Sequence, residues 1–462
     1  MAILPIDGGR YGTDEMKSVF GDQNKIDCQV QIEGAVAAAQ GEIGTIPKRA
    51  ADAIREAAAA PGSVTAKRVA QLEAELDHDT AALVEALGQR CPESARPWIH
   101  YGLTSNDLVD TSNSMQIRDA LGIMEPKIAR LASILAEMAE RYAEVPAVGR
   151  THGQHASIIA FGLKFANWAA EMTAHMDRID GIRERVLVCK TLGVVGTGSL
   201  MGRRAPDVQR RVARTLGLYP ALVATQTVPR ERYAEYVFEM ALIGATLEKI
   251  AVEIRNLQRT EIGEVAEPFG SGQMGSSAVP VKRNPIKSER VTSLARILKS
   301  QVAVSMDNIP LWHERDLSNS ANERFVAPTV SILADEMLET MLAVVPNLSV
   351  NTERIRENLH VTRGQIFAEF VLEAMIRKGV PRMKAYRDVQ RVAFEANESG
   401  MAYADAIKSD GSISSVLTRA EIDAVFDPAR RLGASARIIR GVARAVGRRT
   451  AAADAHARRG SA

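Results

Sequence analysis

Residues 240–257 read MALIGATLEKIAVEIRNL, and this stretch decides the fold class. Its large apolar side chains recur at alternating steps of three and four residues, at Met240, Ile243, Leu247, Ile250, Ile254 and Leu257. That spacing gathers them on one face of a helix. It is typical of the seam between helices that pack nearly parallel in a bundle.

Two other stretches carry the same spacing. The first presents Ile128, Leu131, Leu135, Met138 and Tyr142, and the second presents Phe161, Phe165, Trp168, Met172, Met176 and Ile179. Strand signals are few, and only residues 184–195 form a notable run of β-branched side chains. The sequence therefore predicts an all-α protein. Helices of about 25 residues, roughly 37 Å long, exceed what one small domain needs, so we expect the bundles to associate.

Breaks in the helical patterns predict three regions. Pro92 and Pro97 precede the segment 100–110, and Gly364 follows a polar stretch, residues 351–363. We therefore expect three domains: an N-terminal helical domain over residues 1–112, a central long-helix bundle with a glycine-rich loop over 113–364, and a C-terminal helical domain over 365–462.

Composition and charge exclude several classes of protein. Of the 462 residues, 46% are hydrophobic and 25% are charged, a balance that supports a folded core. With 58 basic and 56 acidic side chains the net charge is +2, which gives no argument for nucleic acid or a membrane as the partner. Cys28, Cys91 and Cys189 are far apart and odd in number, so no disulfide framework is predicted and a reducing, cytoplasmic setting is expected.

Three stretches bear on export, membrane insertion and nucleic-acid binding. Residues 1–7 lack the basic and long apolar regions of a signal peptide. The apolar stretch 330–345 is interrupted by Asp335, Glu336 and Glu339, so it predicts a packed helix and not a membrane span. After Asp427 many arginines stand among alanines and glycines; a solvated helix with a frayed end is favoured there over a nucleic-acid-binding tail.

Residues 270–285 read GSGQMGSSAVPVKRNP and form a glycine-rich loop. The first six match GxGxxG, but a dinucleotide site needs a preceding strand, and here a long helix precedes the loop. Asn284 and Pro285 resemble an N-cap and first position of a helix running through Lys299. The loop is therefore either an ordinary capped helix start, or a site where the helix N-terminus, Lys282 and Asn284 bind a carboxylate beside Ser276.

Histidines gather in polar contexts. The segment RTHGQHA, residues 150–156, holds His152 and His155, and His78, His100 and His313 also stand in loop-like or helix-start positions. Metal binding is disfavoured, because no HExxH spacing or nearby cysteine accompanies the pair. A histidine can donate or accept a proton near neutral pH, while a capping or core role is about as probable for either residue alone.

Several blocks together resemble the fumarase/aspartase superfamily, and within it the adenylosuccinate lyase family most closely. Residues 275–285 fit the superfamily signature GSSxMPxKxNP except that Val279 replaces methionine. The blocks THGQ (151–154), GLTS (102–105) and WHERD (312–316) match in the expected order. The resemblance spans nearly the whole chain and implies an all-α fold whose central helices form a homotetramer, with each active site built by three subunits.

The resemblance also implies a reaction, the elimination of fumarate from a succinyl-bearing amine or alcohol. By this resemblance Ser276 is the general base, His152 the general acid, and Glu289 orients His152 from a neighbouring subunit. Lys282 and Asn284 would hold the succinyl carboxylate as charge develops on it. A serine is a poor base unless its alkoxide is stabilised, so a cationic, closed site is needed. Such chemistry requires no cofactor or metal.

The same resemblance implies a small-molecule succinyl-nucleotide substrate. Arg10 and Tyr11 match the phosphate-contacting pair at the N-terminus of the family. A second phosphate cluster is matched by Arg315, Ser320 and Arg324, and the guanidinium groups of the two arginines suit a phosphate. The other expected substrate contacts are His78, Asp79, Thr104, Ser105, Gln226 and Arg290.

Three positions depart from the family pattern. Asp77 stands where a basic residue is common, Val281 where histidine or tyrosine is usual, and Asn319 where histidine is common. They leave the elimination intact but bear on the substrate, so a superfamily relative with another substrate, such as a carboxymuconate cycloisomerase or a specialised carbon–nitrogen lyase, is the alternative. A protein that keeps the fold without catalysis is a separate hypothesis, which the intact Ser276, His152 and Lys282 disfavour.

Overall fold

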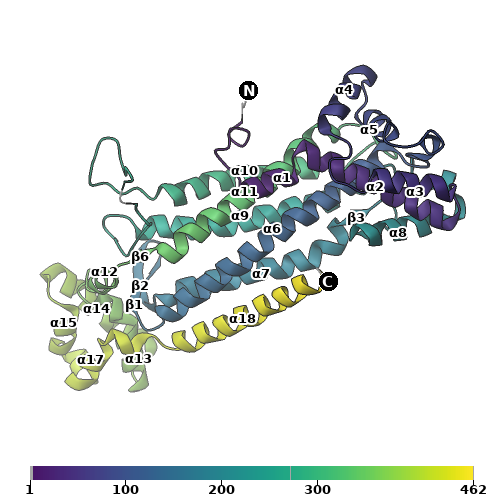
Figure 1. Cartoon of the computed structure of the whole chain (residues 1–462). Helices are drawn as coiled ribbons and strands as arrows, with labels where there is room; N and C mark the ends of the chain where they lie inside the picture. The colour runs from purple at the N-terminus through teal and green to yellow at the C-terminus, as the bar shows by residue number, and fades with distance from the viewer. Residues whose placement is uncertain (1–3, 271, 461–462) are drawn as a thin grey trace. The chain divides into compact units, whose positions relative to one another are not determined.

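The computed structural model describes residues 4–270 and 272–460, with the backbone alone for residues 453–460. Residues 1–3 of the N-terminal segment, Ser271 of the glycine-rich loop and residues 461–462 of the arginine-rich tail lie outside the described residues. Helices make up most of the described chain (Figure 1), which confirms the all-α prediction.

The elements follow in chain order. The α-helices are α1 (Asp14–Val19), α2 (Asp22–Ile43), α3 (Lys48–Ala57), α4 (Ala66–Leu76), α5 (Asp79–Gly88), α6 (Ser105–Arg141), α7 (Gly162–Val186), α8 (Ala205–Leu216), α9 (Glu231–Leu257), α10 (Ile286–Asp307), α11 (Ser320–Val344), α12 (Thr352–Asn358), α13 (Ala368–Arg377), α14 (Arg382–Ser399), α15 (Tyr403–Ser409), α16 (Gly411–Ser414), α17 (Arg419–Val425) and α18 (Ser435–Gly460). Short 3₁₀ helices are η1 (Arg96–Trp98), η2 (Ser199–Arg204), η3 (Val345–Asn347), η4 (Gln365–Phe367) and η5 (Pro428–Arg431).

The three long helices expected from the apolar spacing are α6, α7 and α9. Every member of the opening stripe on α9 is buried, with exposed fractions of 3% or less from Met240 to Leu257. The stripes on α6 and α7 are buried as well, except for Tyr142, which is half-buried; Phe161 and Tyr142 lie just beyond the helix ends. The stretch 330–345 is the packed helix α11, as expected.

The strands differ from the expectation. Within the described residues, the run 184–195 forms only β3 (Val188–Cys189), paired in parallel with β4 (Tyr219–Pro220), because α7 continues to Val186. A hairpin that the sequence analysis did not anticipate joins β1 (Pro146–Thr151) to β2 (Gln154–Ala160). A third pair joins β5 (Val265–Ala266) to β6 (Ser349–Val350).

The chain divides into two compact units, and the long helices contribute to both. Unit 1 holds residues Met1–Ile128, His175–Leu247 and Ser293–Glu339. Polar pairs between its helices include the Tyr236 and Ser331 hydroxyls at 2.7 Å, which join α9 to α11. Another joins α7 to α9, where the His175 imidazole lies 2.7 Å from the Glu239 carboxylate in a site that is almost fully buried.

Unit 2 holds residues Ala129–Ala174, Glu248–Thr292 and Thr340–Ala462. Its C-terminal helices α13 to α17 enclose an apolar core around Phe367, Met375 and Tyr403, to which Val148 and Ile158 of the hairpin also belong. The three domains expected from the sequence stay a prediction, because the two units interleave along the chain.

Two further expectations concern the late part of the chain. The arginine-rich tail forms the helix α18, in which Ile439 and Val446 are buried and the arginines at 437, 440, 444 and 448 are exposed. That pattern agrees with the favoured interpretation as a solvated helix. Among the described residues no helix is both long and apolar enough to cross a membrane.

Candidate active site

A cavity of about 510 Å³ in unit 1 collects most of the expected substrate contacts of that unit. Its lining comes from the start of α5, the start of α6, the segment before α11 and the first turns of α11. Among the residues that line it are His78, Asp79, Ser105, Arg315, Ser320 and Arg324. The structure thus brings together side chains that lie more than 200 residues apart in the sequence.

The cations of this cavity are held by polar partners. Arg315 donates from Nη1 to the Oε1 atom of Gln226 at 2.8 Å, so Gln226 joins the same group. Arg324 lies 3.5 Å from the Asp79 carboxylate, an exposed contact that a phosphate could displace. Burial lowers the pKa of Arg315 from its ordinary value, but an arginine still carries its charge at neutral pH.

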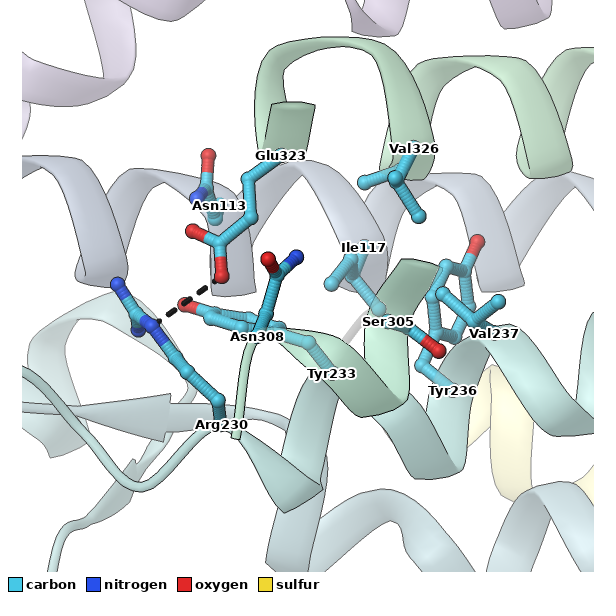
Figure 2. A pocket seen from close by; sticks show the side chains of 11 residues that line it. Asn113, Ile117, Arg230, Tyr233, Tyr236, Val237, Ser305, Asn308, Glu323 and Val326 are labelled. Atoms are coloured by element: carbon cyan, nitrogen blue, oxygen red, sulfur yellow. Dashed lines mark ion pairs between the residues drawn. The ribbon is translucent and has the colours of Figure 1, made fainter. Parts of the chain in front are cut away.

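Arg230 and Glu323 form an ion pair in the lining of this cavity, with Arg230 buried and Glu323 partly exposed. Figure 2 shows Arg230 facing Glu323, with 3.2 Å between Nε and Oε1. The Arg230 guanidinium also lies 5.1 Å above the ring of Tyr233. Arg230 and Glu323 both line the 510 Å³ cavity as well as the small pocket drawn in the figure.

A neighbouring cavity holds Thr104 beside His78, Ser105 and His100. His78 is the N-cap of α5, and its Nδ1 accepts from the backbone N–H of Ala81 at 3.2 Å. Because Nδ1 is an acceptor, the neutral ring carries its proton on Nε2. His78 can therefore present Nε2–H as a donor to a ligand.

His100 carries an electrostatic signal that its motif did not reveal. Its Nδ1 lies 2.6 Å from Oε1 of Glu33, a carboxylate that is 2% exposed, and its backbone N–H donates to the same carboxylate at 3.0 Å. Burial disfavours the charged ring, but the hydrogen bond and charge of Glu33, with a contribution from Asp107, raise the pKa of His100 above its ordinary value.

The N-terminal pair lies in unit 1 but outside the lining of these two cavities. The Arg10 guanidinium lies 5.9 Å above the ring of Tyr11. The residues that follow fasten the segment to α11: the Gly12 N–H donates to Glu336 at 3.0 Å, and Thr13 donates its hydroxyl proton to Asp335 at 2.5 Å.

The glycine-rich loop lies in unit 2 and carries Ser276, whose hydroxyl is bonded to the backbone that follows it. Its Oγ accepts two backbone N–H groups, from Ala278 at 3.3 Å and Val279 at 3.1 Å. Donors to a hydroxyl oxygen stabilise the alkoxide more than the alcohol, which favours deprotonation. A Cβ on Gly275 would lie 2.0 Å from the carbonyl oxygen of Lys282, so the loop can close on itself only with glycine there.

A second cavity, of about 810 Å³, opens beside this loop. It holds the expected Lys282, Asn284 and Glu289 together with Arg255 and Arg259 of the segment that ends α9. Four cationic side chains, counting Arg283, face a single carboxylate in its lining, so the cavity favours an anionic ligand. Arg290 is not part of the lining of this cavity. Its Nη2 donates a hydrogen bond to the Thr340 hydroxyl at 3.2 Å.

The prediction that Asn284 is the N-cap of α10 is wrong. Asn284 does not cap the helix; its Nδ2 donates to the carbonyl oxygen of Gly275 at 2.9 Å. The cap is the buried carboxylate of Glu267, which accepts from the backbone N–H of Lys287 at 3.2 Å and of Ser288 at 2.6 Å. Two backbone N–H groups of the helix N-terminus therefore already donate to a side chain of this chain. The helix also runs past Lys299 to Asp307.

His152 stands at the tip of the β1–β2 hairpin. The two-residue turn between the paired Thr151 and Gln154 is His152–Gly153, with φ values of +54° and +75°. Positive φ at both central residues is what a type I′ turn requires. Arg150 of β1 anchors the hairpin through an ion pair with Glu264, 2.6 Å long and buried on the Glu264 side.

Comparisons with known proteins identify the family. The family described as Lyase matches residues 9–298, and the one described as Adenylosuccinate lyase C-terminus matches residues 364–442. The adenylosuccinate lyase of Methanocaldococcus jannaschii is 41% identical over 95% of this chain and 95% of its own. The chain belongs to the adenylosuccinate lyase family. The adenylosuccinate lyase of Pyrococcus horikoshii is 42% identical over 96% of this chain and 97% of its own.

Solved structures place the adenylosuccinate lyase family in the wider fumarase/aspartase superfamily. A fumarate lyase from Mesorhizobium superimposes with a TM-score of 0.85 at 30% identity, covering 94% of this chain and 98% of its own. A 3-carboxy-cis,cis-muconate lactonizing enzyme from Pseudomonas putida gives 0.86 at 27% identity, over 97% and 100%.

The positions that depart from the adenylosuccinate lyase pattern lie in or beside these cavities. Asn319 is buried and lines the 510 Å³ cavity, and Val281 is 88% exposed in the lining of the 810 Å³ cavity. Asp77 ends α4 in the left-handed conformation, one residue before His78. Sequence reasoning missed Lys25 of α2, which adds a cation to the 510 Å³ cavity and belongs to no motif.

Among the described residues, no group of three or more histidine, cysteine, aspartate or glutamate side chains is arranged to hold a metal ion. Burial and the Arg150 charge lower the pKa of His155, so its ring is neutral at physiological pH.

Proposed function

We propose that the protein eliminates fumarate from adenylosuccinate to give AMP, and from the succinylaminoimidazole carboxamide ribotide, in purine nucleotide biosynthesis. The observation that carries this proposal is the identity of 41% to an archaeal adenylosuccinate lyase over 95% of both chains. The reaction is the cleavage of a carbon–nitrogen bond in a small succinyl-nucleotide.

Ser276 acts as the general base in this proposal. Its alkoxide, stabilised by the N–H groups of Ala278 and Val279, takes the proton from the carbon β to the leaving nitrogen. The electron pair left on that carbon is delocalised into the adjacent carboxylate, beside the Lys282 ammonium. The Asn284 amide holds Gly275 with one N–H, and offers its other N–H and its carbonyl oxygen to the substrate.

His152 acts as the general acid. As the carbon–nitrogen bond breaks, the electron pair of that bond goes to the nitrogen, and His152 gives it a proton. The exposed position of His152 at a hairpin tip suits a side chain that reaches into the site of another subunit. Glu289 would orient and polarise this imidazole from a neighbouring chain.

The substrate phosphate would be bound by the cations of unit 1. Arg315, Ser320 and Arg324 line one cavity. One guanidinium group can donate two parallel N–H hydrogen bonds to the oxygens of a phosphate. Arg10 and Tyr11 would add the second phosphate contact. The other proposed substrate contacts are Thr104, Ser105, Asp79, Gln226 and Arg290, with His78 donating from Nε2.

We further propose a homotetramer in which three subunits share each active site. Two features support it: His152 makes no hydrogen bond to Ser276 or Lys282 in the described part of the chain, and apolar side chains such as Phe238, Ile297 and Phe325 are exposed on long helices. A reducing, cytoplasmic location suits Cys28, Cys91 and Cys189, which are buried and unpaired.

A muconate cycloisomerase reaction is the alternative. The similarity of fold to the lactonizing enzyme does not separate the two activities, since a fold hosts many reactions. Sequence identity separates them, at 41% to adenylosuccinate lyases against 27% to that enzyme.

The test of this function compares two serine variants. Ser276→Ala should lower kcat for fumarate release from adenylosuccinate by about 10² to 10⁴-fold, the usual contribution of a general base. Ser300→Ala, an exposed serine of α10, is the matched control and should retain wild-type turnover. Wild-type turnover in Ser276→Ala would exclude Ser276 as the base.

A further inference from the structure

Two buried aspartates stand one helical turn apart at the start of α6, and each faces a buried cation. Asp107 and Asp110 are both 0% exposed. Lys190 Nζ lies 2.6 Å from Oδ1 of Asp107, and Arg230 Nη1 lies 2.9 Å from Oδ1 of Asp110. None of these four side chains belongs to the residues assigned to catalysis or substrate binding above.

The first pair ties three backbone segments together. Lys190 Nζ donates to the carbonyl oxygens of Gly193 at 2.8 Å and Gln226 at 2.7 Å. The second oxygen of the Asp107 carboxylate, Oδ2, accepts from the N–H groups of Thr104 at 2.9 Å and Gly193 at 3.0 Å. Thr104 and Gln226 are expected substrate contacts, so two of the three segments carry the site.

The second pair ties the same segment to α11. Oδ2 of Asp110 accepts from the N–H of Val228 at 2.9 Å, and Arg230 donates to the carbonyl oxygen of Val228 at 3.3 Å. The other edge of the Arg230 guanidinium faces Glu323, as Figure 2 shows. Glu323 lies on α11 between Ser320 and Arg324, the two expected phosphate contacts of that helix.

Both pairs hold the backbone of residues 226–228. The Gln226 carbonyl oxygen is held by Lys190, its N–H donates to the carbonyl oxygen of Glu314 at 3.2 Å, and two residues later Val228 is held by Asp110. The Gln226 side chain in turn accepts from Arg315. A displacement of this backbone would therefore displace the guanidinium expected to bind phosphate.

Stability alone is a weak reason to keep such pairs. Burying a charged group costs several kcal/mol, and an apolar pair of equal volume is often as stable or more so. Burial raises the pKa of Asp107 against the opposing effects of Lys190 and the two N–H donors, which is the direction a costly site gives. The partners of both pairs lie in segments that carry the expected site residues.

We propose that Asp107–Lys190 and Asp110–Arg230 are positioning pairs that fix Gln226, and through it Arg315, for binding the anionic group of the substrate. This inference rests on the proposed function, because the site residues are those expected of an adenylosuccinate lyase. The pairs touch no reacting atom, so they act on the affinity for the nucleotide and not on the chemical step.

The first measurement is the effect of Lys190→Met on the two kinetic constants. Removing the three contacts of Nζ should raise KM for adenylosuccinate about tenfold and change kcat by less than about threefold. Glu239→Gln is the matched control: it perturbs another buried carboxylate contact of unit 1, with the His175 imidazole, that touches no expected site residue, and it should leave KM unchanged.

A double-mutant cycle separates positioning from general destabilisation. In a Gln226→Ala background the link to Arg315 is already lost, so Lys190→Met should raise KM no further. Additive effects on KM, or an unchanged KM in Lys190→Met alone, would overturn the proposal. If Lys190→Met does not fold, the double variant Asp107→Asn with Lys190→Met, which leaves no unpaired buried charge, takes its place in the cycle.

A binding measurement makes this test independent of turnover. Calorimetry with inorganic phosphate should give a Kd that is about tenfold weaker in Lys190→Met than in wild type and the same in Glu239→Gln as in wild type. A wild type that binds phosphate but releases no fumarate would contradict the proposed function alone. Equal phosphate affinity in wild type and Lys190→Met would contradict the positioning role alone.

Discussion

At the scale of single residues, left-handed backbone marks the candidate site. Among the described residues, positive φ outside glycine occurs at Asp77, His100, His152, His313 and Arg363. The first four lie in or next to the motifs that the sequence analysis singled out. A non-glycine residue in this region costs of order 1 kcal/mol or more and persists where the surroundings require it, which is often at a functional site.

The turn at His152 allows activity and stability to be separated. Glycine and asparagine adopt positive φ readily, so His152→Gly and His152→Asn should unfold at or above the wild-type temperature. Both should lose about 10² to 10⁴-fold in kcat, because the general acid is gone. Thermal unfolding and fumarate release measured on the same preparations check this prediction.

His152→Ala provides the contrast. It removes the same imidazole but places alanine at positive φ. It should therefore be as inactive as His152→Gly, and its free energy of unfolding should be about 1 kcal/mol lower than that of His152→Gly. Full activity in any of the three variants would rule out His152 as the acid.

The raised pKa of His100 predicts a pH dependence of stability. A group whose pKa is higher in the folded protein stabilises it fully below its unfolded value, about 6.5. That contribution is lost as pH rises through the higher folded value. The free energy of unfolding should therefore fall with pH above about 6.5, and Glu33→Gln should remove this slope because the Glu33 charge holds the pKa up.

Urea denaturation of wild type and Glu33→Gln from pH 5.5 to 9 measures this effect. We expect the difference in unfolding free energy between the two proteins to be largest at the acid end and to shrink toward the alkaline end. A difference that grows with pH would show that Glu33 does not stabilise a protonated His100.

At the scale of elements, the start of α10 depends on a residue far from it in sequence. Glu267 accepts two helix N–H groups and the Ser288 hydroxyl, and it lies at the opposite end of the glycine-rich loop from the helix. The same carboxylate therefore closes the loop and caps the helix. This arrangement fixes both ends of the segment that carries Ser276 and Lys282.

Glu267→Gln should weaken both functions of that carboxylate. A neutral amide forms weaker hydrogen bonds than a charged cap and can orient only one oxygen toward the helix, so unfolding should be easier by about 1–3 kcal/mol. KM should rise as well, because the loop loses an anchor. Glu261→Gln, a change at an exposed glutamate, is the control and should alter neither quantity.

The sequence predicted helices well and caps and hairpins poorly, for physical reasons. The stripe on α9 is a local pattern that reports burial directly, and it was confirmed at every position. The β1–β2 hairpin turns at His–Gly instead of the more usual Asn–Gly, so its turn signal is weak. The cap of α10 comes from Glu267 through tertiary contact, which no local pattern can show. The run 184–195 begins inside α7, which ends at Val186, and within it only Val188–Cys189 form a strand.

The candidate site was predicted in the same uneven way. Resemblance to a family supplied Arg315, Ser320 and Arg324, which the structure brings to one cavity. It could not supply Lys190 or Glu33, whose importance comes from buried contacts with residues far away in the chain. Roles of individual site residues remain predictions until the variants are measured.

At the scale of the whole molecule, the expected site residues divide between the two units. Unit 1 contains the nucleotide contacts, including Arg315 and Arg324, and unit 2 contains His152, Ser276 and Lys282. A site shared among subunits predicts complementation. Two inactive variants, Ser276→Ala and His152→Asn, should regain activity after their subunits are exchanged.

The expected recovery can be stated as a fraction. If Ser276 and His152 reach one site from different subunits, random exchange gives about a quarter of the sites both intact side chains. Activity should rise toward that share of wild type when equal amounts are unfolded and refolded together. No recovery, with mixed oligomers verified by mass, would place both side chains of each site in one subunit.

The most direct test of the central claim is fumarate release by the purified wild-type protein supplied with adenylosuccinate, followed by absorbance, with the nucleotide product separated by chromatography. We expect fumarate and AMP in equal amounts and no turnover of a carboxymuconate. A folded protein that releases no fumarate from adenylosuccinate would contradict the central claim, and would direct attention to Asp77, Val281 and Asn319 as the residues that set a different substrate.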